Sequence, residues 1–523
     1  MKKRHLKLII SLLTTYFVAL GLLLLAESFS PDASITSFKD AVWYSLVTLT
    51  TVGYGDLFPV TMAGKLIGAI FLFLSTSLVA MLVVLAMTFS QVYSVFRLNF
   101  LQKNSWYIFS SLNPQTASLA QSILITDTSA VIIFPKDDVE KDSQLSSSIK
   151  GKFVFFLKGN VSDALSLKKS TENCHLFFID EDSYGNYRNA LPFSGIGCHI
   201  YCMSDYAPQQ TPADITLFSP YSLCARIYWQ NQPLEQTAKN LVIIGGGNYA
   251  NALLEQALLV NVFSPQQSIN YHIYNNVNFS KIHHRLSQVV SINNTLPDTD
   301  NLIFHTGFWA DDANILANAD RILIWEDIDN ENLNIFSALS DNFALKGKVH
   351  LRLAQKVPGA DSFGSDDQLF TPALVMNMDT VKTAKALHNL YLSTTGSKGP
   401  MWEELSVFTR KSNIAVADHI QTKIRILLND DSITSVNSHL CTEAYKAYIE
   451  KSEGNHEFFR HTEHNRWMRF HALYGWEYAP QRNNSLRQHP SMVPFDQLSE
   501  AEGAKDDSSW ILLNQLADIL KNK

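Results

Sequence analysis

The sequence predicts two membrane-spanning helices, a larger soluble part of α/β class and a small, mainly α-helical end. Two long uncharged runs before residue 100 predict the spans, and short β-branched strands alternating with amphipathic segments predict the α/β part. The chain has 523 residues, of which 46% are hydrophobic and 17% charged, so it is not mainly disordered. Its net charge of -7 gives no reason to expect a nucleic-acid partner.

The first hundred residues carry the two spans. The run from Leu8 to Ala26 has no charge and is long enough to cross a bilayer core of about 30 Å. A secretory signal peptide is the alternative, but the run is too long for one, and a second uncharged run, Leu66 to Phe96, follows. Basic residues precede the first span and Arg97 follows the second, so we expect both termini in the cytoplasm.

A third uncharged run, Ala41 to Gly55, is too short to span and predicts a re-entrant segment. It leads into Thr51-Val52-Gly53-Tyr54-Gly55-Asp56, with Trp43-Tyr44 upstream and Pro59 downstream. This pattern resembles the selectivity filter of potassium channels, whose motif is TVGYG followed by Asp. The resemblance implies a homotetramer in which K⁺, the permeant ion, binds the carbonyl oxygens of Thr51, Val52, Gly53 and Tyr54. It also implies that residues 1–100 are a pore in a lipid bilayer, the bacterial inner membrane.

The same resemblance assigns positions on the inner helix. Ser75 stands where many relatives carry a hinge glycine, which leaves bending at this position in doubt. Thr76, Val79 and Val83 share one helical face and are the candidates for lining the cavity. The alternative for each of them is a core or lipid-facing role.

Residues 101–235 form the first expected α/β lobe. Its expected strands are Trp106–Phe109, Ala130–Phe134, Phe153–Leu157, Leu176–Ile179 and His199–Met203. The segment Lys158–Asp163 resembles a degenerate G-D-x-x-D turn of RCK domains, which are Rossmann-like regulatory lobes of prokaryotic channels. No glycine loop follows the first strand, so we expect this lobe to be structural.

Residues 236–398 form the second expected lobe. A strand over Leu241–Ile244 runs into Gly245, Gly247 and Ala250, which fit the nucleotide-binding pattern G-x-G-x-x-A. The next expected strand ends at Asn275-Asn276, without the acid that binds a ribose, so a merely tight turn remains the alternative. Further strands are expected at Tyr271–Tyr274, Leu302–His305, Arg321–Trp325 and Val349–Leu353.

Acidic loops in this lobe are candidate Ca²⁺ sites. They are Asp361 with Asp366 and Asp367, and Glu326-Asp327 with Asp329 and Glu331. No EF-hand spacing is present, so solvated loop charge is the alternative. Together the two lobes resemble the paired RCK lobes of channel gating rings.

Residues 399–523 are expected to form a helical linker and a terminal domain, with helices over Met401–Arg410 and Ile414–Leu428. The blocks His464-Asn465-Arg466-Trp467, Gly475-Trp476-Glu477-Tyr478, Arg482 and His489-Pro490 resemble the ryanodine-receptor (RyR) repeat. The candidate pocket for an anionic, nucleotide-like ligand consists of His464, Arg466, Trp467, Trp476, Tyr478, Arg482 and His489. An aromatic domain core is the alternative for Trp467 and Trp476.

These observations predict a ligand-gated K⁺ channel with no enzymatic activity. The alternatives are an osmotic, housekeeping K⁺ channel gated by Ca²⁺ or a nucleotide at the lobes, and a membrane-tethered NAD-dependent oxidoreductase. The five cysteines, Cys174, Cys198, Cys202, Cys224 and Cys441, form no CxxC pair, which predicts a reducing compartment for the soluble part.

Overall fold

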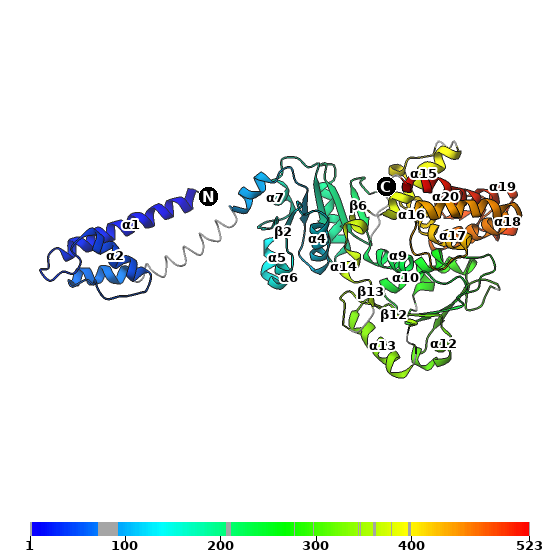
Figure 1. Cartoon of the computed structure of the whole chain (residues 1–523), viewed down its shortest axis with the longest axis horizontal. Helices are drawn as coiled ribbons and strands as arrows, with labels where there is room; N and C mark the ends of the chain where they lie inside the picture. Colours follow the sequence, from blue (N-terminus) through cyan, green and yellow to red (C-terminus); the bar gives the residue numbers. More distant parts are fainter. Residues whose placement is uncertain are drawn as a thin grey trace. The chain divides into compact units, whose positions relative to one another are not determined.

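The computed structural model forms two compact units, Met1–Leu101 and Gln102–Lys523. It describes residues 3–71, 93–205, 211–276, 278–296, 298–343, 345, 347–358, 362–377, 379–395 and 399–521. Figure 1 shows the helices and strands of both units, coloured along the sequence.

In the described residues of the first unit, all regular secondary structure is helical. It contains α1 (Lys3–Glu27) and α2 (Phe38–Leu49), and residues 62–71 and 93–100 are also helical. Ser37 caps α2 in a capping box with Asp40, which fixes where the helix begins. Leu20 and Leu23 of α1 pack with Ala41 of α2 and with Phe71 in a small apolar cluster.

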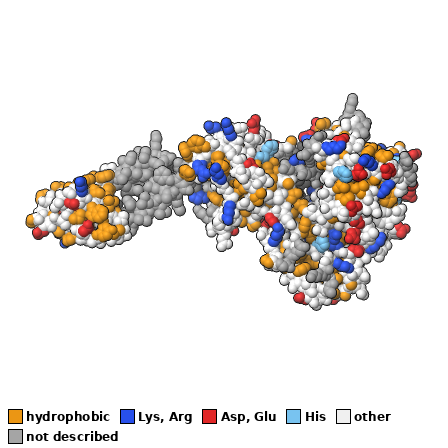
Figure 2. Space-filling model, viewed as in Figure 1, with side chains coloured by type: hydrophobic (Ala, Val, Ile, Leu, Met, Phe, Trp, Pro, Cys, Tyr) orange, Lys and Arg blue, Asp and Glu red, His pale blue; other side chains and the backbone are white. Residues whose placement is uncertain are grey.

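Several large apolar side chains of α1 face outward in this unit, as the orange surface in Figure 2 shows. Phe17, Val18, Leu22 and Leu25 are each more than half exposed. Among the described residues, no helix meets the length and hydropathy required to cross a membrane.

The second unit contains two parallel sheets, and the first has the strand order β3-β2-β1-β4-β5-β6. Its strands are β1 (Trp106–Phe109), β2 (Val131–Pro135), β3 (Val154–Leu157), β4 (Cys174–Phe178), β5 (His199–Met203) and β6 (Ile215–Phe218). Its helices are α4 (Pro114–Thr126), α5 (Lys136–Lys141), α6 (Ser143–Ser148), α7 (Val161–Leu165) and α8 (Ser183–Ala190), with a 3₁₀ turn at Leu191–Phe193. The order reverses at β1, as in doubly wound folds.

The second sheet has the order β13-β12-β11-β7-β8-β10-β9 and is also parallel. Its strands are β7 (Asn240–Ile244), β8 (Asn270–Tyr274), β9 (Ser291–Ile292), β10 (Asn301–His305), β11 (Arg321–Ile324), β12 (Val349–Arg352) and β13 (Ser362–Phe363). Its helices are α10 (Asn248–Val260), α11 (Phe279–Ile282), α12 (Ala313–Asn318), α13 (Asp329–Asn342) and α14 (Asp366–Leu369), with 3₁₀ turns at His284–Gln288 and Trp309–Asp311. The order reverses at β7, so the glycine segment after β7 lies at the switch point.

The rest of the second unit is mainly helical. It contains α15 (Asp379–Thr395), α16 (Val407–Asp418), α17 (Ile420–Leu428), α18 (Ser438–Leu473), α19 (Glu500–Gly503) and α20 (Ser508–Lys521), with a π turn at Ala373–Asn377 and short 3₁₀ turns between them. A two-stranded sheet joins β14 (Glu477–Tyr478) to β15 (Gln488–His489). The helix expected over Met401–Arg410 is wrong in its bounds: Trp402–Glu404 is a 3₁₀ turn, and α16 begins at Val407 because Ser406 caps it.

The terminal helices pack against the second lobe and against α9 (Pro220–Asn231), as Figure 1 shows. Met468, Phe470, Trp476 and Met492 belong to the same apolar core as α9 and α10. The end of α18 and the residues that follow it therefore share a core with α9 and α10, whereas α17, α20 and the rest of α18 form a second apolar cluster.

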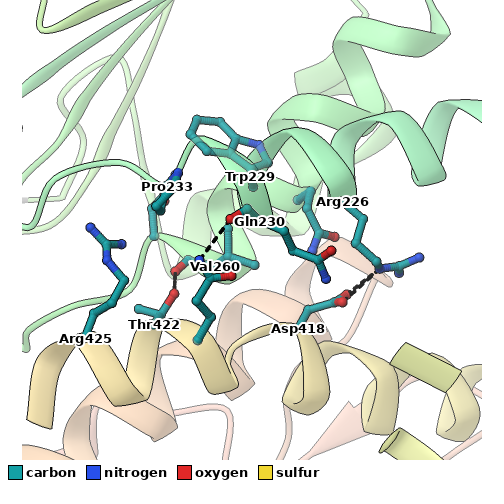
Figure 3. Close-up of a pocket in the computed structure, with 11 residues that line it drawn as sticks. Arg226, Trp229, Gln230, Pro233, Val260, Asp418, Thr422 and Arg425 are labelled. Atoms are coloured by element: carbon teal, nitrogen blue, oxygen red, sulfur yellow. Dashed lines mark hydrogen bonds and ion pairs between the residues drawn. The ribbon is translucent and has the colours of Figure 1, made fainter. Parts of the chain in front are cut away.

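Polar groups close the seam between α9, α10 and α17 (Figure 3). The Thr422 hydroxyl donates to the Val260 carbonyl at 2.8 Å, and the guanidinium of Arg226 donates to Asp418 at 2.8 Å. The Gln421 amide donates to the Gln230 carbonyl at 2.9 Å. A small cavity lies among these side chains.

Candidate functional site

The segment Thr51–Asp56 begins directly after the carboxyl end of α2. The N–H groups of Val52 and Gly53 donate back to the Val47 carbonyl, at 3.1 and 3.4 Å. Thr51, Gly53 and Gly55 have positive φ, of 58°, 62° and 72°. This alternating backbone explains the glycines at 53 and 55, because a Cβ disfavours the left-handed region. The carboxyl end of α2 also provides the partial negative charge that favours a cation.

Two contacts brace this segment. The Trp43 and Tyr54 rings stack with centroids 6.1 Å apart, and the Trp43 indole N–H donates to Asp56 at 2.8 Å. Among the described residues, no backbone hydrogen bond ends on the carbonyl oxygens of residues 51–54. The carbonyls that a dehydrated cation would need are thus free of backbone partners in this part of the chain.

The cavity candidates Thr76, Val79 and Val83, and the hinge position Ser75, lie outside the described residues.

The glycine segment of the second lobe forms a close turn between β7 and α10. A Cβ at Gly245 would lie 2.6 Å from the Trp325 carbonyl oxygen, and one at Gly246 would lie 2.1 Å from that of Asn275. Ala250 is buried, and its Cβ would lie 3.1 Å from a Cβ at Gly245, so α10 packs tightly on β7. These short distances leave no room for a Cβ, so packing alone explains the glycines at positions 245 and 246.

Two carboxylates of the chain occupy the donors of this turn. Asp327 accepts from the N–H groups of Asn248 and Tyr249, both at 3.0 Å, and Glu326 accepts from the N–H of Gly246 at 3.1 Å. A Cβ at Gly247 would lie 2.3 Å from the Asp327 carboxyl carbon. A phosphate binds such a turn through the same N–H groups, so it would have to displace both carboxylates.

Several carboxylates of the candidate Ca²⁺ sites are bound by other groups of the chain. Asp329 is held by Arg352 and by the N–H groups of Ala354 and Gln355. Asp367 is paired with Lys356, and Asp361 lies outside the described residues. In the described part of the chain, no group of three or more His, Cys, Asp or Glu side chains is arranged to hold a metal ion.

The terminal domain brings several of its expected pocket residues together around Trp467. Its ring lies 5.1 Å from His489 and 5.7 Å from His464, measured between centroids, and Trp476 lies 6.1 Å from His489. Trp467 and His489 are half-buried, whereas Trp476 is buried. Tyr478, 53% exposed, is the register partner of His489 across the small sheet.

Arg482 supplies positive charge near these rings. Its side chain is exposed, and its guanidinium donates to Asn484 at 2.9 Å. Burial and then the charge of Arg482 hold the pKa of His489 below its usual value. Burial lowers the pKa of the neighbouring His471 to about 3, so at neutral pH this ring is an uncharged part of the aromatic cluster.

Arg466 and His464 are placed differently from the expectation. Arg466 is 1% exposed and pairs with Glu463 at 2.7 Å, away from the surface. His464 is buried, with Nε2 bound to the Val493 carbonyl at 2.8 Å. Both side chains are buried and have partners inside the domain, so neither presents a group to a ligand at the surface.

Sequence reasoning missed the partners of Arg466. Glu463 also binds Lys423 of α17 at 2.9 Å, and both side chains are almost fully buried. Lys423 and Glu463 lie 40 residues apart in the sequence, so no local pattern could identify the pair. The sequence also gave no signal that Glu326 and Asp327 would reach back to the glycine turn.

Comparisons with known proteins match the first unit to ion channels. Residues 8–91 match the ion channel family. A segment of 64 residues is 39% identical to potassium voltage-gated channel subfamily A member 6 of Homo sapiens and 38% identical to subfamily A member 2 of Oncorhynchus mykiss. The match covers 11% of this chain and 12–13% of those relatives, so the chain spans about an eighth of their length.

Solved structures of the GsuK channel resemble the chain over a larger part. The structure bound to ADP covers 70% of this chain at 12% identity, with a TM-score of 0.33. The structure bound to NAD covers 70% at 11% identity, also with a TM-score of 0.33.

Proposed function

We propose that four copies of this chain form a K⁺-selective channel in the bacterial inner membrane, with both termini in the cytoplasm. The observation that carries the proposal is the segment Thr51–Asp56, which lies at the end of a capped helix within the ion channel match. Carbonyl oxygens of residues 51–54 and the Thr51 hydroxyl replace the hydration shell of K⁺ when four copies surround one axis. Because residues 8–91 match ion channels, we propose a channel without enzymatic activity.

The test is K⁺ flux into liposomes that contain the purified full chain. Gly53→Ala is expected to abolish selective flux, because Gly53 has a φ of 62° that a Cβ disfavours. Gly21→Ala is the matched control, since nothing lies within 4 Å of the Cβ position at Gly21. Equal flux of K⁺ and Na⁺ through the unaltered chain would contradict the proposal.

We further propose that the terminal domain senses a small anionic ligand with a flat ring. Trp467 and His489 are half-buried aromatic rings, and Arg482 places a charge near His489. The glycine turn of the second lobe supports a nucleotide site less well, because Glu326 and Asp327 already hold its N–H groups. This occupancy counts against the osmotic channel gated by nucleotide at the lobes and against the NAD-dependent oxidoreductase.

A thermal-shift titration of the full chain in detergent tests the sensor. Ribonucleoside monophosphates and diphosphates and cyclic dinucleotides are the probes, and CaCl₂ tests the alternative ligand. A binding probe is expected to raise the melting temperature, and Arg482→Ala is expected to weaken that probe at least tenfold. Arg188→Ala, at an exposed arginine of α8, is the control that keeps binding unchanged. A probe that binds the Arg482→Ala variant as tightly as the unaltered chain would place the sensor elsewhere.

A further inference from the structure

Two buried cysteines of the first lobe lie beside each other on neighbouring parallel strands. The register of β4 and β5 pairs His175 with His199, and Cys174 and Cys198 are the residues just before this pair. Each of the two thiols shifts the pKa of the other, so the two side chains are neighbours. Neighbouring strands are about 4.8 Å apart, and a disulfide takes a Cα–Cα separation of about 4.4–6.8 Å. The spacing of neighbouring strands therefore falls in the range of Cα separations that a disulfide takes.

The pair lies at the edge of the lobe rather than deep in its core. Cys198 follows the exposed Gly197 and precedes the exposed His199, and Cys174 follows the exposed Asn173. The Thr171 hydroxyl donates to the Ile196 carbonyl at 2.8 Å, so the two loops that carry the cysteines are tied together. A small oxidant can reach this edge through local opening of these loops.

The other three cysteines lack these features. Burial alone raises the pKa of the Cys202 thiol to about 12 and that of Cys441 to about 11, and burial also raises that of Cys224 to about 12. The neighbouring Cys174 thiol instead lowers the pKa of Cys198. Cys198 is thus the cysteine best suited to react as a thiolate.

We propose that Cys174 and Cys198 are a redox-active pair that closes into an intramolecular disulfide when hydrogen peroxide reaches the lobe. The Cys198 thiolate attacks one peroxide oxygen, the O–O bond breaks, and a sulfenic acid forms while hydroxide leaves and takes up a proton. The Cys174 sulfur then displaces the sulfenic hydroxyl, which departs as water with the thiol proton. In sum, two thiols and one peroxide give one disulfide and two waters.

The location gives this bond a structural consequence. The Lys168 ammonium donates to the carbonyls of Gln102 and Asn104, both at 2.7 Å, and the Trp106 N–H donates to the Asn173 carbonyl. The residues that directly follow the first unit in sequence are therefore anchored on the loop that ends at Cys174. A disulfide to Cys198 would tie this anchor to β5.

The test uses the purified full chain with its five cysteines. The reduced chain is exposed to hydrogen peroxide, denatured in acid, labelled with a maleimide and digested for mass spectrometry. We expect two thiols to be lost, a peptide that joins Cys174 to Cys198, and full recovery with dithiothreitol. Five free thiols after oxidation, a cross-link to another cysteine, or a bond between two chains would overturn the proposal.

Variants separate the two steps. Cys174→Ser is expected to leave a Cys198 sulfenic acid that dimedone traps, and Cys198→Ser is expected to leave neither a disulfide nor a dimedone adduct at Cys174. Cys202→Ser is the matched control, because Cys202 is buried on the same strand as His199 and should leave the loss of two thiols unchanged. Dimedone labelling of Cys174 in place of Cys198 would contradict the assigned order of attack.

Discussion

Asp327 holds the first turn of α10 in the second lobe, because its carboxylate accepts from the N–H groups of Asn248 and Tyr249. We expect Asp327→Ala to cost about 1 kcal/mol, the usual loss for a helix cap, and to lower the melting temperature of this part by roughly 2–4 °C. Differential scanning calorimetry of the full chain measures this change. Asp341→Ala is the control, since Asp341 is exposed near the carboxyl end of α13.

The same variant tests whether the carboxylate blocks an anion. If Asp327 occupies a usable phosphate cradle, Asp327→Ala gains affinity for ADP, because the N–H groups lose their internal acceptor. If the glycine turn exists only for packing, ADP affinity stays unchanged, which we expect from the missing ribose ligand at Asn275-Asn276. A gain of tenfold or more would contradict the packing interpretation.

The buried Lys423 predicts that the stability of the folded chain depends on pH. Burial lowers its pKa to about 8 in the folded chain, whereas an unfolded lysine titrates near 10.4. Between these values the unfolded chain binds more protons than the folded chain, so the contribution of Lys423 to stability rises with pH through this window. We expect the melting temperature of the unaltered chain, compared with that of Lys423→Met, to rise between pH 7.5 and 9.5.

A constant difference between the two proteins across this range would show that Lys423 stays charged beside Glu463. Lys446→Met is the matched control, because Lys446 is exposed and pairs with its helix neighbour Glu443. Its melting temperature should follow that of the unaltered chain at both pH values.

At the scale of elements, a buried ion pair joins α18 to the sheet of the second lobe. Arg469 lies 2.8 Å from Asp300, and both side chains are buried. Asp300 also accepts from the N–H of Ile269 at 2.7 Å. Arg469→Ala leaves a buried carboxylate without its cation, so we expect a loss of about 3–5 kcal/mol in the free energy of unfolding.

A double-mutant cycle with Asp300→Ala measures the pair in denaturant unfolding of the full chain. We expect the double variant to be more stable than the sum of the single losses predicts, because the unpaired charge is gone. Arg482→Ala, at an exposed arginine, is the control and should change stability by less than about 0.5 kcal/mol. Additive losses would mean that the two side chains are not coupled.

The strands were the most predictable elements. The expected strands at Trp106–Phe109 and His199–Met203 have the bounds of β1 and β5, because β-branched and aromatic residues form short runs there. β6, β9 and β13 were missed. β9 and β13 have only two residues each and no pattern of their own, whereas β6 has four residues. The α/β class was thus predictable from local sequence. The packing of α17 and α18 against the second lobe was not, because it depends on contacts between residues far apart in the sequence.

The candidate sites were predictable to different degrees. The segment Thr51–Asp56 forms a motif over six consecutive residues, so its place after a helix could be expected. The aromatic cluster around Trp467 was also expected, but the burial of Arg466 was not, because Glu463 replaces a surface ligand as its partner. The occupancy of the glycine turn by Asp327 depends on the β11 loop, about 80 residues away in the sequence.

At the scale of the whole molecule, the terminal helices are part of the fold of the second unit. The carbonyls of Leu234, Val260 and Val262 accept hydrogen bonds from Arg425, Thr422 and His419, and all three donors are buried. Removing these helices would expose apolar surface of α9 and α10 and leave buried acceptors without donors. The seam is therefore part of the fold of the second unit.

This arrangement predicts the outcome of truncating the chain after Gly399. We expect the truncated protein to aggregate or to melt at least 10 °C lower, since a shared core and buried polar contacts are lost together. Its flux in liposomes would then report damage to the second unit rather than loss of a sensor.

The discriminating variant is Arg482→Ala with His489→Ala, which changes an exposed and a half-buried side chain and leaves the seam intact. We expect this double variant to keep its melting temperature and K⁺ flux without ligand, and to lose only the response to the binding probe. A truncated chain that stays monodisperse and melts like the full chain would show that the terminal helices are an independent module.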